Sequence, residues 1–342
     1  MTPKIGIIAN PVSARDIRRV VASASSIQIA DRANIVLRTL AALAACGIDD
    51  VVMMPERGGV GSHVVRGIER SRNQGEERFP RLSFLPIPVT GTVEDTRRAA
   101  AAMAAAGDVA VIVVLGGDGT HRAVAGACGS VPIAGISTGT NNAFPEHREP
   151  TITGLAAGLA ATGRVPPAVA FADNKVIEVR IDGGPPDIAL VDAAIVTDRF
   201  VGARALWRTE TFRELYVTFA DPEVIGMAAI AGLVETVGRD EPGGLALTLA
   251  PADTAARRVR APIAPGLIGT IGIDSWRRLP AGTPVTPALP AGAVALDGER
   301  ELFFDPHQTV TVTLIDRAFR TVDTAAVMRF AARHGLLLDR QP

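Results

Sequence analysis

A continuous run of apolar, largely β-branched residues, Val109–Leu115, leads directly into a Gly-Gly-Asp-Gly-Thr loop at 116–120. Such a run is typical of a strand that is buried on both faces of a parallel sheet. Open sheets of this kind bind their ligands at the carboxyl ends of the strands, which is where this loop would lie. The junction therefore predicts an α/β fold with a glycine-rich site at one edge of the sheet.

The rest of the first half alternates between short apolar runs and helical spacing. Apolar runs at 5–8, 51–54 and 81–87 predict strands, and the spacing at 33–46 predicts a helix. A second helix is predicted between Thr92, as its N-cap, and Gly107. This alternation predicts a Rossmann-like parallel sheet with helices on both faces.

The second half differs, because its short apolar runs are separated by Gly, Pro and Asp turns. This spacing predicts a mostly antiparallel β domain with helical insertions near 200–212 and 222–237. We therefore expect an α/β domain at 1–165, a β-rich domain at 166–321, a cleft between them, and a C-terminal segment at 322–342 that packs back on the first domain. The runs expected to form strands lie at 175–181, 188–196, 245–249, 267–273, 293–296 and 309–315.

Length and composition exclude several classes of protein. The chain has 342 residues, enough for about two domains. Its 35 basic and 36 acidic residues give a net charge of −1, which argues against nucleic acid or an anionic membrane as the main partner. Cys46 and Cys128, the only cysteines, build no disulfide framework, so we expect a reducing cytoplasm. The only lysines are Lys4 and Lys175, which excludes a Walker A motif.

The first loop has the residue types that bind phosphate. The glycines Gly116, Gly117 and Gly119 permit positive φ angles and let backbone N–H groups approach phosphate oxygens. Thr120 can cap the following helix and offer its hydroxyl to the same anion. Asp118 is the only acid of the loop, and phosphoryl transfer needs a carboxylate that accepts a proton or holds Mg²⁺. The alternative is a plain glycine turn with a solvated Asp.

A second polar loop at 137–144 follows an apolar run at 131–136. Its hydroxyls and amides suit phosphate oxygens, adenine edges and ribose hydroxyls, and its glycine allows a tight turn. The residues concerned are Thr138, Gly139, Thr140, Asn141 and Asn142. An asparagine-rich turn is the alternative. Because two polar loops follow successive strands, we favour a nucleotide site.

Gly-Gly-Asp-Gly-Thr after a strand resembles the signature of the superfamily that joins NAD kinases with diacylglycerol and sphingosine kinases. The resemblance extends in order through Asn10-Pro11, the second loop, and segments at 261–266 and 297–299. The opening at 10–19 and the second loop look most like the branch of the ATP-NAD kinase family that contains the acetoin-catabolism X protein. The resemblance implies ATP and Mg²⁺ as cofactors, a nucleotide contact for Asn10, and a homo-oligomer.

The same resemblance implies functional roles for three acids outside the first loop. Asp297-Gly298-Glu299 is similar to an element near the end of these chains, although Asp-Gly is also a common hairpin turn. In lipid kinases the acid of this element is implicated in catalysis, which makes Glu299 a rival or partner of Asp118. NAD kinases grip NAD with an Asn-Glu pair, and Asp192 is the nearest counterpart here. The second loop is closer to that of lipid kinases, which leaves the identity of the substrate open.

These features predict an ATP- and Mg²⁺-dependent kinase that phosphorylates a hydroxyl of a small molecule, first of all the 2′-hydroxyl of NAD to give NADP. A kinase for another alcohol (a lipid, a polyol or an acetoin-related metabolite) is the alternative. A further one is an accessory protein that binds NAD or ATP without turnover. We expect Asp118 and Glu299 to act in catalysis, Asp118 to hold the metal, and Asp192 and Asp297 to contact the acceptor.

Overall fold

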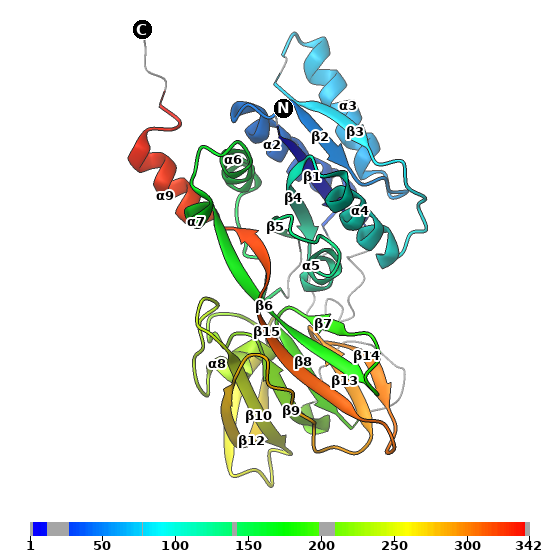
Figure 1. Cartoon of the computed structure of the whole chain (residues 1–342), viewed down its shortest axis with the longest axis vertical. Helices are drawn as coiled ribbons and strands as arrows, with labels where there is room; N and C mark the ends of the chain where they lie inside the picture. Colours follow the sequence, from blue (N-terminus) through cyan, green and yellow to red (C-terminus); the bar gives the residue numbers. More distant parts are fainter. Residues whose placement is uncertain (1–2, 12–26, 77, 139–141, 198–208, 339–342) are drawn as a thin grey trace.

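The computed structural model describes residues 3–11, 27–76, 78–138, 142–197 and 209–338. Its N-terminal domain is built on five parallel strands in the order β3-β2-β1-β4-β5 (Figure 1). Helices α2, α3 and α6 pack on one face of this sheet, and α4 and α5 pack on the other. The strands are β1 (Lys4–Ala9), β2 (Asp50–Met53), β3 (Arg81–Phe84), β4 (Val109–Gly116) and β5 (Ile133–Ser137). The helices are α2 (Ile29–Ala45), α3 (Val60–Asn73), α4 (Val93–Ala106), α5 (Asp118–Ala125) and α6 (Pro150–Ala161).

The order of the strands reverses at β1, which lies between β2 and β4. Doubly wound sheets bind ligands at such a reversal, beyond the carboxyl ends of the strands. Ala9 pairs with Leu115, and Gly116 pairs with Ser137, so β1, β4 and β5 end side by side. The segments that follow these three strands therefore meet at one edge of the sheet.

Two long strands connect the domains. β6 (Phe171–Ile181) and β15 (Val310–Val322) pair antiparallel along their length, and Thr321 of β15 pairs with Ile133 of β5. Their other ends pack in the core of the C-terminal domain, through residues such as Val179 and Val312. The short strand β7 (Asp187–Ala189) completes this sheet, and α7 (Pro167–Ala170) and α9 (Thr324–His334) contact each other beside α6.

The C-terminal domain holds a seven-stranded antiparallel sheet in the order β11-β12-β10-β9-β8-β13-β14. Its strands are β8 (Asp192–Val196), β9 (Phe212–Val217), β10 (Gly244–Ala250), β11 (Arg257–Ala264), β12 (Leu267–Leu279), β13 (Gly292–Leu296) and β14 (Glu299–Phe304). The short helix α8 (Met227–Gly232) packs against β11 and β9.

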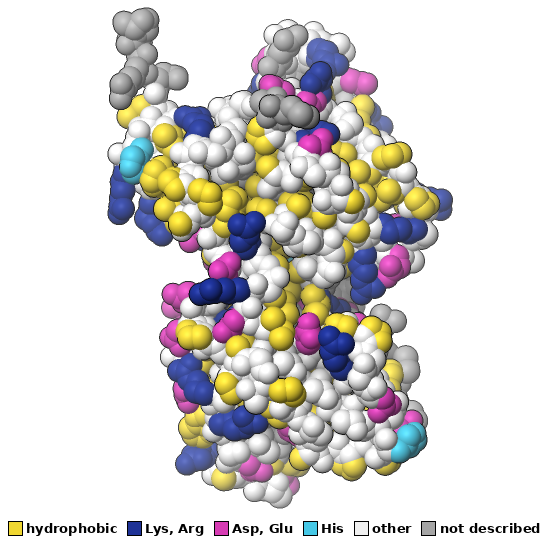
Figure 2. Space-filling view, viewed as in Figure 1, with side chains coloured by type: hydrophobic (Ala, Val, Ile, Leu, Met, Phe, Trp, Pro, Cys, Tyr) yellow, Lys and Arg dark blue, Asp and Glu magenta, His cyan; other side chains and the backbone are white. Residues whose placement is uncertain are grey.

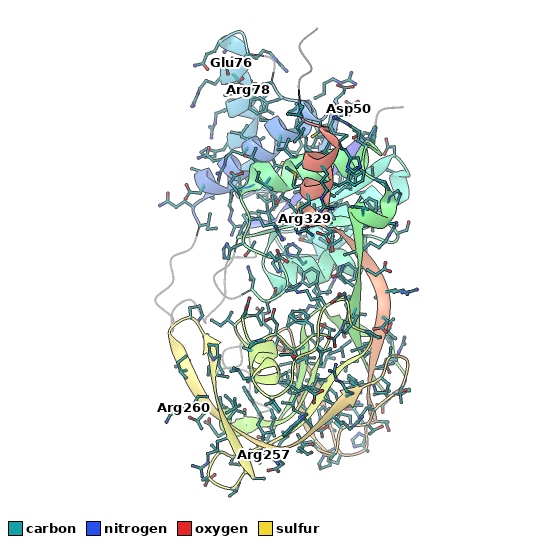
Figure 3. The ribbon with its side chains drawn as sticks, turned by 90° about the vertical axis from the view of Figure 1, so that its left-hand side faces the viewer. Asp50, Glu76, Arg78, Arg257, Arg260 and Arg329 are labelled. Carbon is teal, nitrogen blue, oxygen red and sulfur yellow. The ribbon has the colours of Figure 1, made fainter. Side chains whose placement is uncertain are left out.

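The two domains form separate lobes, and the surface is hollowed between them on one side (Figure 2). In the view turned by 90°, Asp50, Glu76 and Arg78 lie on one lobe and Arg257 and Arg260 of β11 on the other (Figure 3). Within the described part of the chain, no helix combines the length and the apolar character that crossing a membrane requires.

The predicted fold class is confirmed: a parallel α/β domain followed by an antiparallel β domain. Thr92 and Gly107 bound α4 as expected, because the Thr92 side chain accepts a hydrogen bond from the N–H of Glu94 and Gly107 is left-handed. Helix α3 was not predicted; it begins in the glycine-rich segment 58–61, where Glu56 accepts hydrogen bonds from the N–H groups of Gly59 and Gly61.

The expected helical insertions are only partly correct. The insertion at 222–237 contains one short helix, α8, and the rest of the segment is irregular. Most of the insertion at 200–212 lies outside the described residues, but its last residue, Phe212, begins β9 instead of ending a helix. β9 forms because strands β8 and β10 flank it on both sides, and helical periodicity in the sequence does not reveal such partners.

Candidate functional site

The first loop lies where the sequence placed it, but its glycines act differently from the expectation. Gly116 ends β4, and Gly117 is the N-cap of α5 with a φ of −96°. None of Gly116, Gly117 and Gly119 has a positive φ. A Cβ at Gly116 would lie 2.4 Å from Thr120, and a Cβ at Gly117 would lie 2.6 Å from Oδ1 of Asn142. The first two glycines therefore serve close packing rather than a left-handed turn.

Thr120 is also placed differently from the expectation. It is buried in the first turn of α5 against Gly116, and the capping position belongs to Gly117, which makes no side-chain cap. Because α5 already begins at Asp118, Thr120 lies inside the first turn, and its side chain packs on Gly116 at the end of β4. A phosphate contact for Thr120 therefore stays a prediction.

We expect Gly117→Ala and Gly119→Ala to affect stability in opposite ways. The new methyl group at Gly117 would press on Asn142, which costs about 1–3 kcal/mol when nothing can move away. At Gly119 no heavy atom lies within 4 Å, and alanine in the first turn of a helix should be neutral or stabilise by up to about 1 kcal/mol. Thermal unfolding of the two variants checks this, and equal midpoints would contradict the packing role of Gly117.

The second loop meets the first through its two ends. The N–H of Thr138 donates to the carbonyl oxygen of Gly116 at 3.2 Å, which continues the pairing of β4 with β5. Nδ2 of Asn142 donates to Oγ of Ser137 at 2.8 Å, so the loop is closed across its base. Three predicted contacts, Gly139, Thr140 and Asn141, lie outside the described residues. Thr138 is buried and Asn142 half-buried beside Gly117.

Asp118 joins the two loops. Its Oδ2 accepts a hydrogen bond from the N–H of Ala143 at 3.0 Å, and its Oδ1 accepts one from the N–H of Phe144 at 2.9 Å. The carboxylate also lies in the first turn of α5, where the helix dipole favours a negative charge. The orientation of Asp118 is therefore set by two consecutive peptide groups of the second loop.

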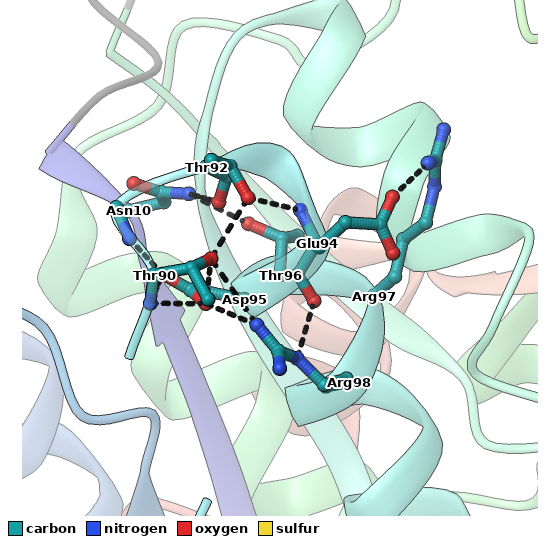
Figure 4. Close-up of polar contacts among 9 residues, drawn as sticks. Asn10, Thr90, Thr92, Glu94, Asp95, Thr96, Arg97 and Arg98 are labelled. Atoms are coloured by element: carbon teal, nitrogen blue, oxygen red, sulfur yellow. Dashed lines mark hydrogen bonds and ion pairs between the residues drawn. The ribbon is translucent and has the colours of Figure 1, made fainter. Parts of the chain in front are cut away.

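Asn10 holds the start of α4 (Figure 4). Its Nδ2 donates to Oγ1 of Thr96 at 3.0 Å and to the carbonyl oxygen of Thr92 at 3.3 Å. Beside it, Asp95 accepts hydrogen bonds from the backbone N–H groups of Thr90 and Gly91 and from Arg98. Burial opposes the charged form of Asp95, but these hydrogen bonds prevail and lower its pKa. This polar cluster fixes the chain at the carboxyl end of β1.

Asp297 is fully buried and contacts backbone groups. It and Gly298 have φ angles of 51° and 77°, the two left-handed residues of a tight hairpin between β13 and β14. Its Oδ1 accepts hydrogen bonds from the N–H groups of Leu190 at 3.0 Å and Val191 at 2.8 Å. Burial raises the pKa of Asp297, while the Arg122 guanidinium, 3.6 Å away, and these N–H groups act in the opposite direction. The geometry favours a positioning role for Asp297.

Asp192 and Asp118 face one small pocket between the domains. The pocket has a cavity volume of only about 10 Å³. It is lined by Asp118 and Ala143 from one side, and from the other by Asp192, Ile225, Gly226, Met227, Ile263, Asp297 and Gly298. Asp192 is buried at the start of β8, and its carbonyl oxygen accepts a hydrogen bond from the N–H of Asp297. Glu299 begins β14 and is half-buried outside the pocket lining. The pocket thus brings together Asp118 of the N-terminal domain with Asp192 and Asp297 of the C-terminal domain.

His121 directly follows the first loop, where the sequence predicts either a phosphate contact or an exposed side chain, and the structure buries it beneath the loop. Its Nδ1 lies 2.9 Å from the carbonyl oxygen of Gly117, to which it donates. Its ring lies 6.0 Å from that of Phe144, and among the described residues no group bonds its Nε2. Burial lowers the pKa of His121 to about 4, so the imidazole is neutral near pH 7.

His121 should make the protein less stable in mild acid. The unfolded chain takes up this proton near pH 6.5 and the folded protein only near pH 4, so the unfolding free energy falls as the pH drops through that window. Across this whole pH range, the unfolding free energy falls by roughly 3 kcal/mol because of His121. Urea unfolding at about pH 7.5 and about pH 5 should show a smaller loss for His121→Asn, which keeps a donor toward Gly117 but does not titrate. Equal losses in variant and wild type would refute this role.

Three cationic side chains of the site contact distant parts of the chain, and of these the sequence marked only Arg122, as a possible phosphate contact or an exposed residue next to the first loop. Arg122 is half-buried, donates to the carbonyl oxygen of Leu296 at 3.2 Å and so links α5 to the hairpin at Asp297. Arg239 reaches the second loop from the C-terminal domain, and Lys175 holds the segment that carries Arg239. All three contact residues more than 60 positions away in the chain, so no local motif could predict these contacts.

Two family models match the chain. The model described as "ATP-NAD kinase N-terminal domain" matches residues 5–165, and that described as "Acetoin catabolism protein X C-terminal domain" matches residues 175–317. Acetoin catabolism protein X of Cupriavidus necator is 57% identical to the chain over 341 residues, which cover 98% of this chain and 94% of that protein.

Two solved structures are similar to the chain. The crystal structure of "a putative diacylglycerol kinase from Bacillus anthracis" has a TM-score of 0.51 at 14% identity and covers 94% of this chain and 97% of that one. Yeast NADH kinase complexed with NADH has a TM-score of 0.46 at 11% identity and covers 100% of this chain and 90% of that one. The first likeness shows the fold alone, and the second is too weak to bear on it.

Proposed function

Since the chain belongs to the family of acetoin catabolism protein X, with an N-terminal half that matches the ATP-NAD kinase domain, we propose that it is an ATP-dependent kinase for a hydroxyl of a small molecule. NAD, phosphorylated at its 2′-hydroxyl, is the first acceptor to test. The observation that carries the proposal is the meeting of two polar loops at the ends of β4 and β5, next to acids from both domains.

Each loop has a part in the proposed reaction. The exposed N–H end of α5 and the base of the second loop would receive the phosphates of ATP, because a helix N-terminus and backbone N–H groups attract anions. Asp118 would accept the proton of the attacking hydroxyl or hold Mg²⁺, with Glu299 as the rival for the first of these roles. Asp192 would orient the acceptor from the C-terminal domain, and Asp297 would fix the wall behind it.

The side chains present fit a Mg²⁺ ion that is held mainly by nucleotide. Among the described residues, no group of three or more His, Cys, Asp or Glu side chains is arranged around a common metal position. Mg²⁺ in phosphoryl-transfer sites usually takes one or two carboxylates, and its other ligands are phosphate oxygens and water. Asp118 would supply the carboxylate. When bound, the ion would neutralise charge on the transferred phosphoryl group.

A different alcohol is the second candidate acceptor. The pocket wall opposite Asp118 comes entirely from the C-terminal domain, and this is the part that matches the acetoin catabolism protein X model. The acceptor side can therefore differ from that of NAD kinases while the ATP side stays the same. An acetoin-related hydroxyl compound is the first choice within this class. We also propose that the protein is a homo-oligomer in the cytoplasm. The domain boundaries at residues 165 and 321 belong to the same proposal.

The first experiment measures ADP release from Mg-ATP with NAD, using Asp118→Asn as the control. NAD-dependent release with matching NADP formation supports the leading proposal. Release that requires another alcohol, from a panel of small diols and hydroxyketones, moves the assignment to the second candidate. If ATP binds but no acceptor in the panel is phosphorylated, the enzyme proposal gives way to a nucleotide-binding accessory protein.

A further inference from the structure

Arg239 crosses from the C-terminal domain to the second loop. It lies between α8 and β10, and its Nη1 donates to the carbonyl oxygen of Phe144 at 3.0 Å. Its Nη2 donates to the carbonyl oxygen of Ala143. The N–H groups of the same two residues donate to Asp118. The N–H groups of Ala143 and Phe144 thus bind Asp118 of the N-terminal domain. The carbonyl oxygens of the same two residues bind Arg239 of the C-terminal domain.

The guanidinium is itself held on its faces. It lies 4.1 Å from the ring centroid of Phe219 and 5.6 Å from that of Phe144, distances at which a cation is attracted to an aromatic face. Burial lowers the pKa of Arg239, against the charges of Glu146, Asp118 and Asp221, and a guanidinium stays charged in proteins. The two hydrogen bonds and the two aromatic rings therefore fix the orientation of the Arg239 guanidinium.

The segment that carries Arg239 is fixed from behind by a buried lysine. Nζ of Lys175 donates to the carbonyl oxygens of Gly238 at 3.1 Å, Glu241 at 2.7 Å and Gly243 at 2.7 Å. Lys175 belongs to β6, one of the two strands that connect the domains. The position of Arg239 is therefore tied to the same strand that sets how the lobes are joined.

We propose that Arg239 is a positioning residue, which holds Ala143 and Phe144 so that their N–H groups aim the carboxylate of Asp118 into the pocket between the domains. This inference rests on the proposed function for its kinetic consequence. Its structural consequence, the fixing of Ala143 and Phe144 by a side chain of the other domain, does not depend on any reaction. Removing the guanidinium would leave two carbonyls without their donors and Asp118 bound to a looser segment.

The two donors of the guanidinium matter more than its charge. A lysine ammonium is a compact point charge and cannot reproduce a planar fork that bonds two carbonyls while its faces lie on aromatic rings. We therefore expect Arg239→Lys to behave more like Arg239→Gln than like wild type. Arg278→Gln is the matched control, because Arg278 contacts Glu235 and Glu241 of the same segment from its exposed side.

The test has two independent readouts. Hydrogen exchange at the amides of Ala143 and Phe144 should become at least about tenfold faster in Arg239→Gln and Arg239→Lys, and should be unchanged in Arg278→Gln. With the acceptor identified, kcat should fall about 10- to 100-fold in both Arg239 variants, while the KM for ATP changes less than about threefold.

Either readout can overturn the inference. Unchanged exchange in folded Arg239→Gln would show that the loop end needs no arginine. Faster exchange with unchanged kcat would leave Arg239 as a structural contact only, and would equally defeat the positioning role. If the wild type transfers no phosphate at all, the proposed function fails, and the exchange readout decides on its own whether Arg239 fixes this segment.

Discussion

Asp118→Asn is expected to reduce kcat by about 10²- to 10⁴-fold, the range typical of a lost acid–base group. The substitution removes the charge that would take the proton or hold Mg²⁺. In the wild type, the N–H groups of Ala143 and Phe144 both donate to the carboxylate. In the variant, the new amide NH₂ would face one of these two N–H groups. One hydrogen bond becomes a contact between two donors, so the end of the second loop should shift as well.

Binding and chemistry can be separated in this variant. We expect the dissociation constant of ATP, from calorimetry, to change less than about tenfold, since the loop glycines and the helix N-terminus remain. Glu146→Gln is the matched control, because it removes an exposed charge near Arg239 without touching the hydrogen bonds of Asp118, and it should keep kcat within about twofold. If Asp118→Asn retained more than about a tenth of the wild-type kcat, Glu299 would become the leading candidate for the base.

Asp297→Asn is expected to lower the free energy of unfolding by about 3 kcal/mol, because it removes the buried ion pair with Arg122, 3.6 Å away, and weakens the hydrogen bonds that Asp297 accepts from the N–H groups of Leu190 and Val191. Asparagine tolerates the left-handed φ of this position, so the turn itself should survive. The loss therefore reports the charge of Asp297 and its bonds to Leu190 and Val191. Guanidinium unfolding of wild type and variant measures it.

Asp182 offers a close control for this substitution. It also has a left-handed φ, 53°, and its carboxylate accepts a backbone N–H, that of Thr309, but it is exposed and bonds Gln308 instead of an arginine. Asp182→Asn should cost less than about 1 kcal/mol, since water replaces what is lost. If the loss of the Asp297–Arg122 pair is the cause, Asp297→Asn combined with Arg122→Met should cost less than the sum of the two single changes. A cost for Asp297→Asn no greater than that for Asp182→Asn would contradict the buried pair.

The sequence predicted where the parts of the site lie better than it predicted the conformations and contacts of their residues. The junction of Val109–Leu115 with its glycine loop predicted both the central strand and its buried environment, because an uninterrupted apolar run needs cover on both faces. The predicted positive φ angles of the loop glycines were wrong. Close packing by Thr120 and Asn142 is the reason for two of those glycines, and such contacts leave no trace in a local pattern.

Local patterns determined the fold class, the placement of the two loops after β4 and β5, and the hairpin at Asp297, since each depends on periodicity or turn preference within about ten residues. Only the tertiary structure decided what these residues contact. Arg122 meets Leu296 across 174 positions and Arg239 meets Phe144 across 95, and both pairs join the two domains. An arginine that will be buried between lobes looks in the sequence like one that will be solvated. Its partners are chosen by the packing of β6, β15 and the strands around them, which no single segment encodes.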